Sequence, residues 1–441
     1  MKRRLILVIA FAGLLLHGLG GMSLLRARAS SPTSEDSGYA NISVLTRALQ
    51  LIRQDYVDDQ RIGYRDLTYA ALRGMLASLD PHSQFMEPQD FKALQDDTKG
   101  DFGGLGIVVS MREGVLTIVS PMEDTPGFKA GLLPGDQILK INGTSTEKLD
   151  ISDAVSQLRG PVGEKVTLTI LRPSTKEIRD FQVERAVIKV RSVKGERLLD
   201  SAETGGYRIG YVRLTQFNEP TAKELEAALD RLEGQGMQAL VLDLRYNPGG
   251  LLNSAVDVCG LFLPPRQVVL TTEGRVASQR KVYRTPDSSR RRPEYPLAIL
   301  INNGSASGSE IVAGALRDLH RAILVGETTF GKGSVQSVVQ LPDGAGLRLT
   351  TAKYYTPSRQ VIHEKGVTPG IRLPLSPREE RDVLLLRREE LPRSEQGESL
   401  KDLRDLQLDR ASDALRGMLV YRERRAAALT AGSGPLAPAV R

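Results

Sequence analysis

Residues 302–332, which read NNGSASGSEIVAGALRDLHRAILVGETTFGK, constrain the fold of this chain more than any other stretch. The apolar run LAILI at residues 297–301 comes directly before them and predicts a strand buried on both faces of a sheet. After the Gly and Ser cluster, apolar residues recur at helical spacing from Ile311 to Leu319. Ser305, Ser307 and Ser309 are therefore expected in a tight turn between a buried strand and a helix.

A strand-to-helix turn of this kind can hold a serine exposed, with the N–H groups of the helix start beside it. That arrangement suits a catalytic nucleophile. A serine in the same place can also simply cap the helix. The turn alone leaves both interpretations open, and other residues have to decide between them.

Composition places the chain among folded, multidomain proteins. It has 441 residues, of which 40% are hydrophobic and 26% charged, enough for several domains and a sizeable core. The net charge is a moderate +7, and the tight basic run at residues 290–292 has no interleaved aromatic residues. We interpret that run as a solvated loop and expect no nucleic-acid partner. The single cysteine, Cys259, lies in an apolar segment and is predicted to be buried.

The N-terminus has the layout of a secretory signal. Three residues, Lys2 to Arg4, precede an apolar run, and a small-x-small site follows at residues 27–29. Residues 1–29 are therefore predicted to direct export, to the periplasm or the outer face of the cytoplasmic membrane. Because the apolar character continues over residues 5–25, an uncleaved membrane tether is the alternative.

Residues 41–98 are predicted to form an N-terminal helical segment. Apolar stripes at helical spacing cover residues 41–58 and 66–79, and the second stripe ends at Asp80-Pro81. His82 follows in a turn. With no second His or Cys nearby in the sequence, it is interpreted as a surface or packing residue rather than a ligand.

Residues 99–187 change to short alternating segments separated by Gly and Pro turns. Strands are expected at residues 115–119, 137–141 and 165–171, and one short helix at residues 152–158. Near the front, glycines surround Leu105, Gly106 and Ile107, whose N–H groups can converge on a carboxylate, while the following strand can accept an extended peptide. Together with the segments at residues 130–136 and 138–143, this region resembles a PDZ domain, which implies capture of protein C-termini.

Strands and helices alternate beyond about residue 188. The segments at residues 207–217, 221–232, 239–245, 251–262 and 323–325 predict an α/β domain with its site at the carboxyl ends of the strands. Two of these strand ends carry glycine turns, at residues 247–250 and 304–308. Such turns can place backbone N–H groups around one developing oxyanion.

Lys332 follows glycines at a spacing like that of a phosphate-binding loop. Position 333 is Gly, however, where that loop needs Ser or Thr to hold magnesium, so a nucleotide site is disfavoured. Lys332 and Gln336 are instead predicted to share one face of a strand, because residues an even number apart do so.

Four separated segments carry a family resemblance. Residues 242–250 (LDLRYNPGG), 302–316, 326–336 (GETTFGKGSVQ) and 349–357 (LTTAKYYTP) resemble the signatures of the carboxy-terminal processing, or tail-specific, serine peptidases. The likeness extends from residue 41 to about residue 372. It implies a crotonase/Clp-protease-like α/β catalytic core at residues 188–372, an inserted PDZ domain, and helical terminal segments.

The resemblance also implies site residues. Ser307 corresponds to the nucleophile, Lys332 to the base and Gln336 to the residue that orients the base, while the oxyanion donors fall on Gly308 and Gly250. The family usually has Ala at position 308, and it uses no metal or cofactor.

Independent chemistry agrees with this assignment. A serine hydroxyl needs an adjacent base, and a lysine amine can serve once burial disfavours its charged form. His320 is the rival base, but it stands at the far end of the helix that Ser307 begins, about 20 Å away at roughly 1.5 Å per residue.

Residues 373–441 are predicted to hold a C-terminal helical segment, with an apolar stripe over residues 402–427, and a disordered Gly/Pro/Ala tail. In the family, terminal helices support dimerisation. Packing of the helix onto the chain's own core is the alternative.

The sequence therefore predicts an exported, ATP-independent serine endopeptidase that recognises apolar protein C-termini through its PDZ domain. An adaptor or activator protein is a further expected partner, and Arg159, at the end of the PDZ helix, is expected to couple peptide binding to the core. The alternative is a non-catalytic PDZ scaffold with a degenerate protease core. The joint presence of Ser307, Lys332 and Gln336 argues against it, and a crotonase-type acyl-binding enzyme has no reason to carry a PDZ segment.

Overall fold

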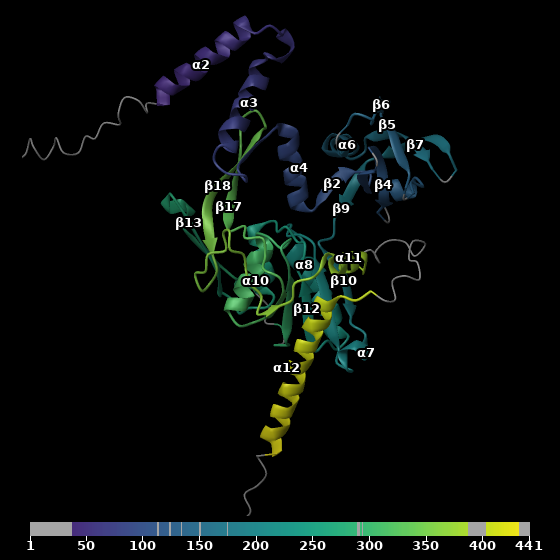
Figure 1. Cartoon of the computed structure of the whole chain (residues 1–441), viewed down its shortest axis with the longest axis vertical. Coiled ribbons are helices and arrows are strands. Elements are labelled where there is room, and N and C mark those ends of the chain that lie inside the picture. The colour runs from purple at the N-terminus through teal and green to yellow at the C-terminus, as the bar shows by residue number, and fades with distance from the viewer. Residues whose placement is uncertain are drawn as a thin grey trace, which may run out of the picture. The chain divides into compact units, whose positions relative to one another are not determined.

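A computed structural model of the chain describes residues 38–386 and 403–431, apart from residues 113, 123, 124, 134, 150, 174, 289–291 and 293 (Figure 1). The chain divides into two compact units after Leu79. The predicted export signal at residues 1–29 and the predicted tail beyond residue 431 lie outside the described residues.

The first unit is helical, as predicted. It contains α2 (Gly38–Asp55), the short 3-10 helix η2 (Asp59–Arg61) and α3 (Tyr64–Ala77). No residue of α2 is buried, and its apolar residues Ile42, Leu45 and Ile52 are exposed. The predicted stripe thus forms a helix without entering a core.

A six-stranded sheet forms the centre of the second unit. Its strands are, in order, β10 (Val193–Leu198), β11 (Ile209–Leu214), β12 (Ala239–Asp243), β15 (Leu297–Ile301), β16 (Ile323–Gly326) and β19 (Ile371–Arg372). All are parallel except β10, which pairs antiparallel at one edge. The predicted α/β alternation is confirmed, and the carboxyl ends of β12 and β15 lie side by side.

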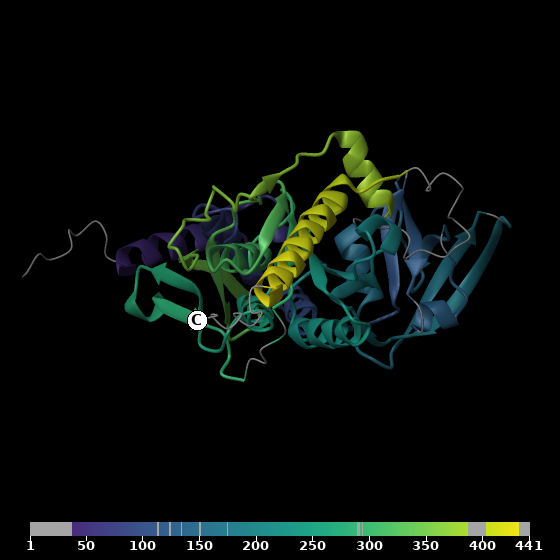
Figure 2. The same cartoon turned by 90° about the horizontal axis from the view of Figure 1, so that it is seen from below.

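Helices cover both faces of this sheet (Figures 1 and 2). Residues Leu240, Leu242, Ile299 and Ile301 pack with α8 (Thr221–Gly234), α9 (Leu252–Gly260) and α10 (Gly308–Asp318). Their neighbours Val241, Ala298 and Leu300 point to the other face, against Ala411, Leu415 and Leu419 of α12 (Leu406–Ala431). Burial on both faces explains the unbroken apolar strands. Packing of the C-terminal helix onto the chain's own core is confirmed.

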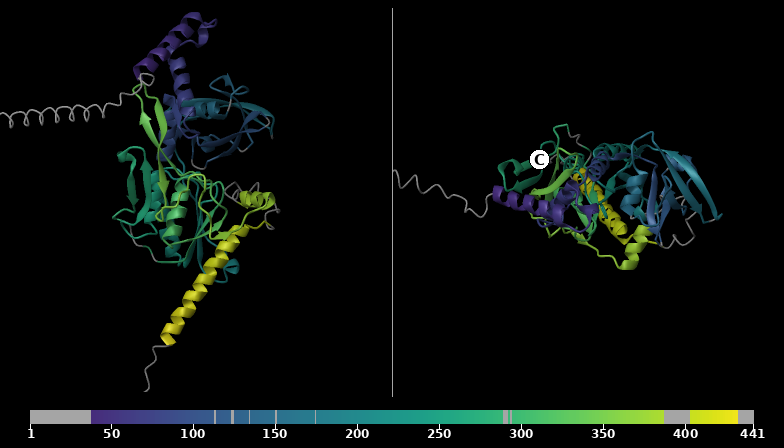
Figure 3. Two further views of the ribbon diagram at one scale, coloured as in Figure 1. Left: turned by 60° about the vertical axis from the view of Figure 1, so that its left-hand side comes forward. Right: turned by 90° about the horizontal axis from the view of Figure 1, so that it is seen from above.

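An antiparallel sheet stands beside the central one. It contains β1 (Gln84–Met86), β13 (Val268–Gly274), β14 (Lys281–Arg284), β17 (Ser334–Gln340) and β18 (Gly346–Tyr355). Figure 3 shows β17 and β18 as a pair of light green strands. The helix α4 (Pro88–Lys99) follows β1, the 3-10 helix η3 (Ala277–Gln279) precedes β14, and the short helices α7 (Ser201–Thr204) and α11 (Pro377–Leu386) complete the unit.

The predicted PDZ region forms its own sheet around its own core. The strands are β3 (Ile107–Arg112), β4 (Val115–Pro121), β5 (Gln137–Ile141), β6 (Thr144–Ser145), β7 (Lys165–Arg172) and β8 (Glu177–Glu184), with helices α5 (Pro126–Lys129) and α6 (Ile151–Leu158). A two-stranded ribbon of β2 (Asp101–Gly104) and β9 (Ala186–Lys189) accompanies it. Ile118, Ile138 and Leu168 are fully buried there. The predicted strands and helix are present.

One interpretation of the basic run is wrong. Arg292 does not lie in a solvated loop: its side chain is 1% exposed and its guanidinium contacts Asp230 at 3.0 Å and Glu233 at 2.9 Å. A cation can be buried in this way because carboxylates pair with it. Cys259 is buried as predicted. Among the described residues, no helix is both long and apolar enough to cross a membrane.

Candidate active site

The serine turn lies at the carboxyl end of β15, and its three serines have different surroundings. The Ser305 hydroxyl donates to the carbonyl of Leu244 at 2.8 Å, and the Ser309 hydroxyl donates to the carbonyl of Asn247 at 2.9 Å. Both residues are fully buried. Ser307 is only half-buried. The two outer serines thus build the turn, and the middle one is accessible.

Ser307 has an unusual backbone. Its φ of 52° lies in the left-handed region that non-glycine residues rarely adopt. The next residue, Gly308, begins α10. A strained residue at a sharp strand-to-helix turn is a feature of activated nucleophiles, because the surrounding structure must hold it there.

The two glycine turns predicted from the sequence meet at Ser307. The carbonyl of Asn247 accepts the N–H of Ala306 at 3.0 Å, and a Cβ added to Gly249 would lie 2.7 Å from the Cβ of Ser307. A Cβ on Gly250, whose φ is 147°, would lie 2.0 Å from the carbonyl oxygen of Phe217. Only glycine permits this close approach.

Two backbone N–H groups beside Ser307 are left for a ligand. Among the described residues, the N–H groups of Gly250 and Gly308 donate to no acceptor, although both residues belong to well-ordered turns. Gly308 is buried and Gly250 is exposed. A buried N–H without a partner is uncommon in folded proteins, whereas an exposed one can bind water or a ligand. The pair forms a candidate oxyanion hole.

The glycine at position 308 has a local explanation. A Cβ there would lie 3.0 Å from the Phe217 ring, which is tighter than an ordinary contact. Gly308, where the resembled family usually has Ala, therefore lies against a bulky neighbour, the ring of Phe217 on the facing turn.

Glu310 joins the serine turn to the lysine segment, and the sequence interpretation missed it. Its buried carboxylate accepts the N–H groups of Ser307 and Lys332, both at 2.8 Å and both on Oε2. Oε1 accepts the N–H of Gly331 at 2.7 Å and the hydroxyl of Thr329. Burial raises the pKa of Glu310, while these four donors favour its charged form. The spacing Ser-x-x-Glu, typical of a capping box, was the available signal.

Tyr354 is a second link between the same segments. Its buried hydroxyl lies 3.2 Å from the carbonyl oxygen of Ser307 and also reaches the carbonyl oxygen of Lys332. Tyr354 belongs to β18, so one residue of the antiparallel sheet contacts both candidate catalytic segments.

Lys332 is half-buried, and its environment disfavours a positive charge. Burial lowers the pKa of Lys332, and the nearby guanidinium of Arg348 lowers it further, against an opposing effect of Glu310. Removing a cation from water and placing another beside it both favour the neutral amine. This is the direction that a lysine base requires.

Gln336 lies in a strand as predicted, and Lys332 does not, because β17 begins at Ser334. The pairing of β17 with β18 shifts between Val335 and Gln336, where β18 carries one extra residue, Thr351. Among the described residues, the Gln336 amide makes no hydrogen bond to Lys332. Its Nε2 instead donates to the hydroxyl of Ser334 at 2.9 Å and to that of Thr350 at 3.4 Å.

The Gln336 contact leads on to the segment that holds His82. The Thr350 hydroxyl donates to the Asp80 carboxylate at 3.2 Å, and that carboxylate also accepts the His82 N–H at 2.7 Å. Burial lowers the pKa of His82, and the charge of Lys332 lowers it further. His82 is half-buried, which agrees with its interpretation as a surface or packing residue.

His320 lies away from this group. It follows the carboxyl end of α10 and lines a cavity of about 380 Å³ with residues of α12, such as Met418 and Arg422. It is therefore not placed to act on Ser307.

The PDZ loop contains the residues that the sequence predicts to bind a carboxylate. Among the described residues, the N–H groups of Leu105 and Gly106 have no backbone acceptor, and Gly106 has a φ of 70°. Ile107 begins the strand β3. Arg159, directly after α6, stacks over Phe102 at 4.1 Å and contacts Asp97 of α4 at 2.9 Å.

Comparison with known proteins identifies relatives over most of the chain. Residues 208–373 match the model of peptidase family S41, and residues 117–172 match that of the PDZ domain. A carboxy-terminal-processing protease of Bartonella bacilliformis is 42% identical over 361 residues, covering 80% of each chain. A carboxyl-terminal-processing protease of Synechocystis sp. is 40% identical over 322 residues, covering 72% of this chain and 74% of the relative.

A solved structure agrees in fold. A protein described as a candidate S41 protease from Bacteroides fragilis has a TM-score of 0.51 at 17% identity, covering 85% of this chain and 97% of that chain. At this identity the likeness concerns the fold alone.

Proposed function

The chain belongs to the carboxy-terminal processing proteases of peptidase family S41, and we propose that it hydrolyses peptide bonds with Ser307 as nucleophile and Lys332 as base. The observation that carries this assignment is the shared hydrogen bonding of the two residues to Oε2 of Glu310. A carboxylate that binds both backbones at once keeps the two segments that carry the hydroxyl and the amine close together.

In the proposed reaction, neutral Lys332 takes the proton of the Ser307 hydroxyl as its oxygen attacks the scissile carbonyl. The protonated lysine then gives that proton to the leaving amine, and an acyl-enzyme remains on Ser307. Water, deprotonated by Lys332, hydrolyses the ester in the second half of the reaction. The N–H groups of Gly308 and Gly250 stabilise the oxyanion in both halves.

We further propose that Leu105, Gly106 and Ile107 bind the carboxylate of an apolar protein C-terminus. The unpaired N–H groups of the loop supply donors, and β3 supplies an edge that an extended peptide can join. Arg159 would then couple this binding to the core, which its contact with Asp97 of α4 supports. Gln336 would act on Lys332 only indirectly, through the Ser334 and Thr350 hydroxyls.

Export, a membrane tether, a homodimer and an adaptor or activator protein remain part of the proposal. The basic and apolar N-terminal sequence supports export with a tether as the alternative. The exposed apolar residues of α2 support self-association. An amphipathic helix that buries no residue in its own chain exposes an apolar face that a second copy of the chain can cover.

Labelling with a fluorophosphonate tests the assignment. We expect the probe to phosphonylate Ser307 with loss of fluoride, and mass spectrometry of tryptic peptides to place the adduct there. A non-catalytic scaffold would remain unlabelled, and an adduct on Ser305 or Ser309 would contradict the proposed nucleophile.

A further inference from the structure

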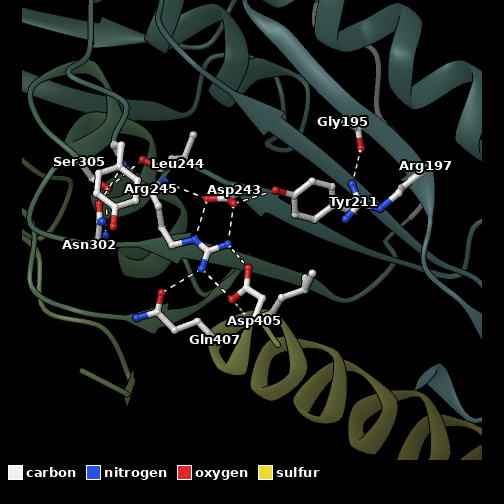
Figure 4. Close-up of polar contacts among 12 residues, drawn as sticks. Gly195, Arg197, Tyr211, Asp243, Leu244, Arg245, Asn302, Ser305, Asp405 and Gln407 are labelled. Carbon is white, nitrogen blue, oxygen red and sulfur yellow. Dashed lines mark hydrogen bonds and ion pairs between the residues drawn. The ribbon is translucent and has the colours of Figure 1, made fainter. Parts of the chain in front are cut away.

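A buried ion cluster lies at the end of β12, two residues before the turn at residues 247–250. We call this turn, which holds Gly250, the oxyanion turn. The side chain of Arg245 is 1% exposed and that of Asp243 is fully buried, and the two are joined at 2.8 Å. Tyr211 donates its hydroxyl to Asp243 at 2.8 Å (Figure 4). A buried guanidinium needs more than one partner to satisfy its donors.

The remaining partners come from the C-terminal segment. Asp405 accepts from Arg245 at 2.6 Å and 2.9 Å, and Gln407 accepts from it at 3.1 Å, across separations of 160 and 162 residues (Figure 4). Tyr246, the residue directly after Arg245, donates its hydroxyl to Glu380 of α11 at 2.6 Å. We call Glu380, Asp405 and Gln407 the C-terminal clasp.

The helix α12 holds the Asp405 carboxylate in place. The N–H of Leu408 donates to that carboxylate at 3.1 Å, and helix N-termini favour anions. Asp405 and Gln407 both reach Arg245 from this end of α12. The cluster is therefore complete only when α12 is docked on the sheet.

A short path leads from the clasp to Ser307. Asn247 follows Tyr246, whose N–H donates to Asn302 at 2.9 Å. The Asn247 carbonyl accepts from Ala306 and from the Ser309 hydroxyl, on either side of Ser307. A displacement of Arg245 would therefore move both the turn that holds Gly250 and the turn that holds Ser307.

We propose that the C-terminal clasp, with Asp405 as its principal member, is a positioning element for peptide hydrolysis that acts through Arg245 and Tyr246 on the oxyanion turn. The inference rests on the proposed roles of Ser307 and Gly250. Under this proposal, α12 affects the rate of the chemical step in addition to packing in the core.

Asp405→Asn tests the clasp with little disturbance of the helix, because Asn is as good an N-cap residue as Asp. The variant loses the ionic contact to Arg245. We expect kcat for a peptide with a free apolar C-terminus to fall about 10- to 100-fold, as small displacements of reacting groups do, with KM unchanged. Phosphonylation of Ser307 by the fluorophosphonate should slow by the same factor.

Glu423→Gln is the matched control. Glu423 also links α12 to the core, by accepting the Tyr207 hydroxyl at 2.8 Å, but it does not contact the cluster. We expect normal kcat in this variant. If Glu423→Gln lowers kcat as much as Asp405→Asn, or if Asp405→Asn keeps kcat within twofold of the parent, the clasp has no role in the chemistry.

Tyr246→Phe provides an independent test if Asp405→Asn does not fold. It removes the contact to Glu380 without changing charge, and an unaltered kcat would overturn the proposal. Arg245→Gln combined with Asp405→Asn should lose no more activity than Arg245→Gln alone. Ser307→Ala, measured in parallel, separates the two ideas, because full activity there contradicts the nucleophile and not the clasp.

Discussion

Ser307 and Lys332 donate their backbone N–H groups to the same oxygen, Oε2 of Glu310, each at 2.8 Å. Ser307 precedes the helix α10 and Lys332 precedes the strand β17, so no regular secondary structure fixes their spacing. The buried carboxylate does so instead. Its contacts are with the backbone of the proposed dyad and not with the reacting atoms, and its charge also acts on the pKa of Lys332 by raising it.

Glu310→Gln should therefore damage catalysis. An amide oxygen can accept at most two of the four donors, and the amide nitrogen would face the others. We expect kcat to fall about 100-fold through misplacement, and each buried donor left unpaired to cost about 1–3 kcal/mol of stability. Kinetics and thermal unfolding measure the two effects separately.

Glu327→Gln is a fair control for that variant. Glu327 lies on the same segment as Thr329 but accepts a single backbone N–H, that of Leu375, at 2.9 Å. Equal losses of kcat in the two variants would mean that Glu310 has no special role.

Substitutions of the three serines of the turn should have different effects on activity and stability. Ser307→Ala should abolish proteolysis and leave the unfolding temperature unchanged, since its half-buried side chain is not part of the core. Ser305→Ala should instead lower stability by about 1–3 kcal/mol, because it leaves the buried N–H of Asn302 without the Ser305 hydroxyl as its acceptor. Turnover by purified Ser307→Ala, or loss of turnover in Ser309→Ala with Ser307 intact and the fold stable, would refute the assignment.

Sequence patterns predicted the parts of this site that depend on local order. The strand at residues 297–301, the serine turn and the glycine turn at residues 247–250 were each visible as apolar runs that end in small residues. Burial of strands on both faces and the freedom of glycine produce those patterns directly.

Contacts between distant segments left no such pattern. Lys332 lies before β17, which begins at Ser334, so the alternation of side chains along a strand does not apply to the pair Lys332 and Gln336. Arg292 looked solvated because its partners lie on α8, about 60 residues earlier in the chain. Asp405, one of the partners of Arg245, is 160 residues away from it in the sequence. Only the fold brings these groups together.

The PDZ loop makes a prediction about substrate ends. Peptides with a free apolar C-terminus should be processed with a lower KM than the same peptides amidated, because an amide has no charge for the N–H groups of the loop to bind. Gly106→Ala should remove this difference, since its Cβ would lie 2.2 Å from that of Thr125. Gly163→Ala is the control: it has a φ of 90° but no neighbour within 4 Å. Equal KM for free and amidated peptides in the parent enzyme would exclude the loop as a carboxylate site.

The pH dependence should report on Lys332. Its amine must be neutral to accept the proton of Ser307, so kcat/KM should fall on the acid side, where Lys332 becomes protonated, and rise towards neutral or mildly alkaline pH. Lys332→Arg should be inactive, because a guanidinium does not give up its proton in this range. His320→Ala should leave the acid limb in place.

Arg348 gives the sharper test, because its charge helps to lower the pKa of Lys332. Arg348→Gln removes that charge, so the pKa of Lys332 rises and the acid limb of kcat/KM moves to higher pH. Arg348→Lys keeps the charge and should leave the limb near its parental position, and added salt should reduce the difference between the two variants by screening. His82 is the other titrating group beside Lys332, and His82→Asn distinguishes its contribution. An acid limb that stays fixed in Arg348→Gln but vanishes in His82→Asn would make the histidine, and not Lys332, the group that limits activity in acid.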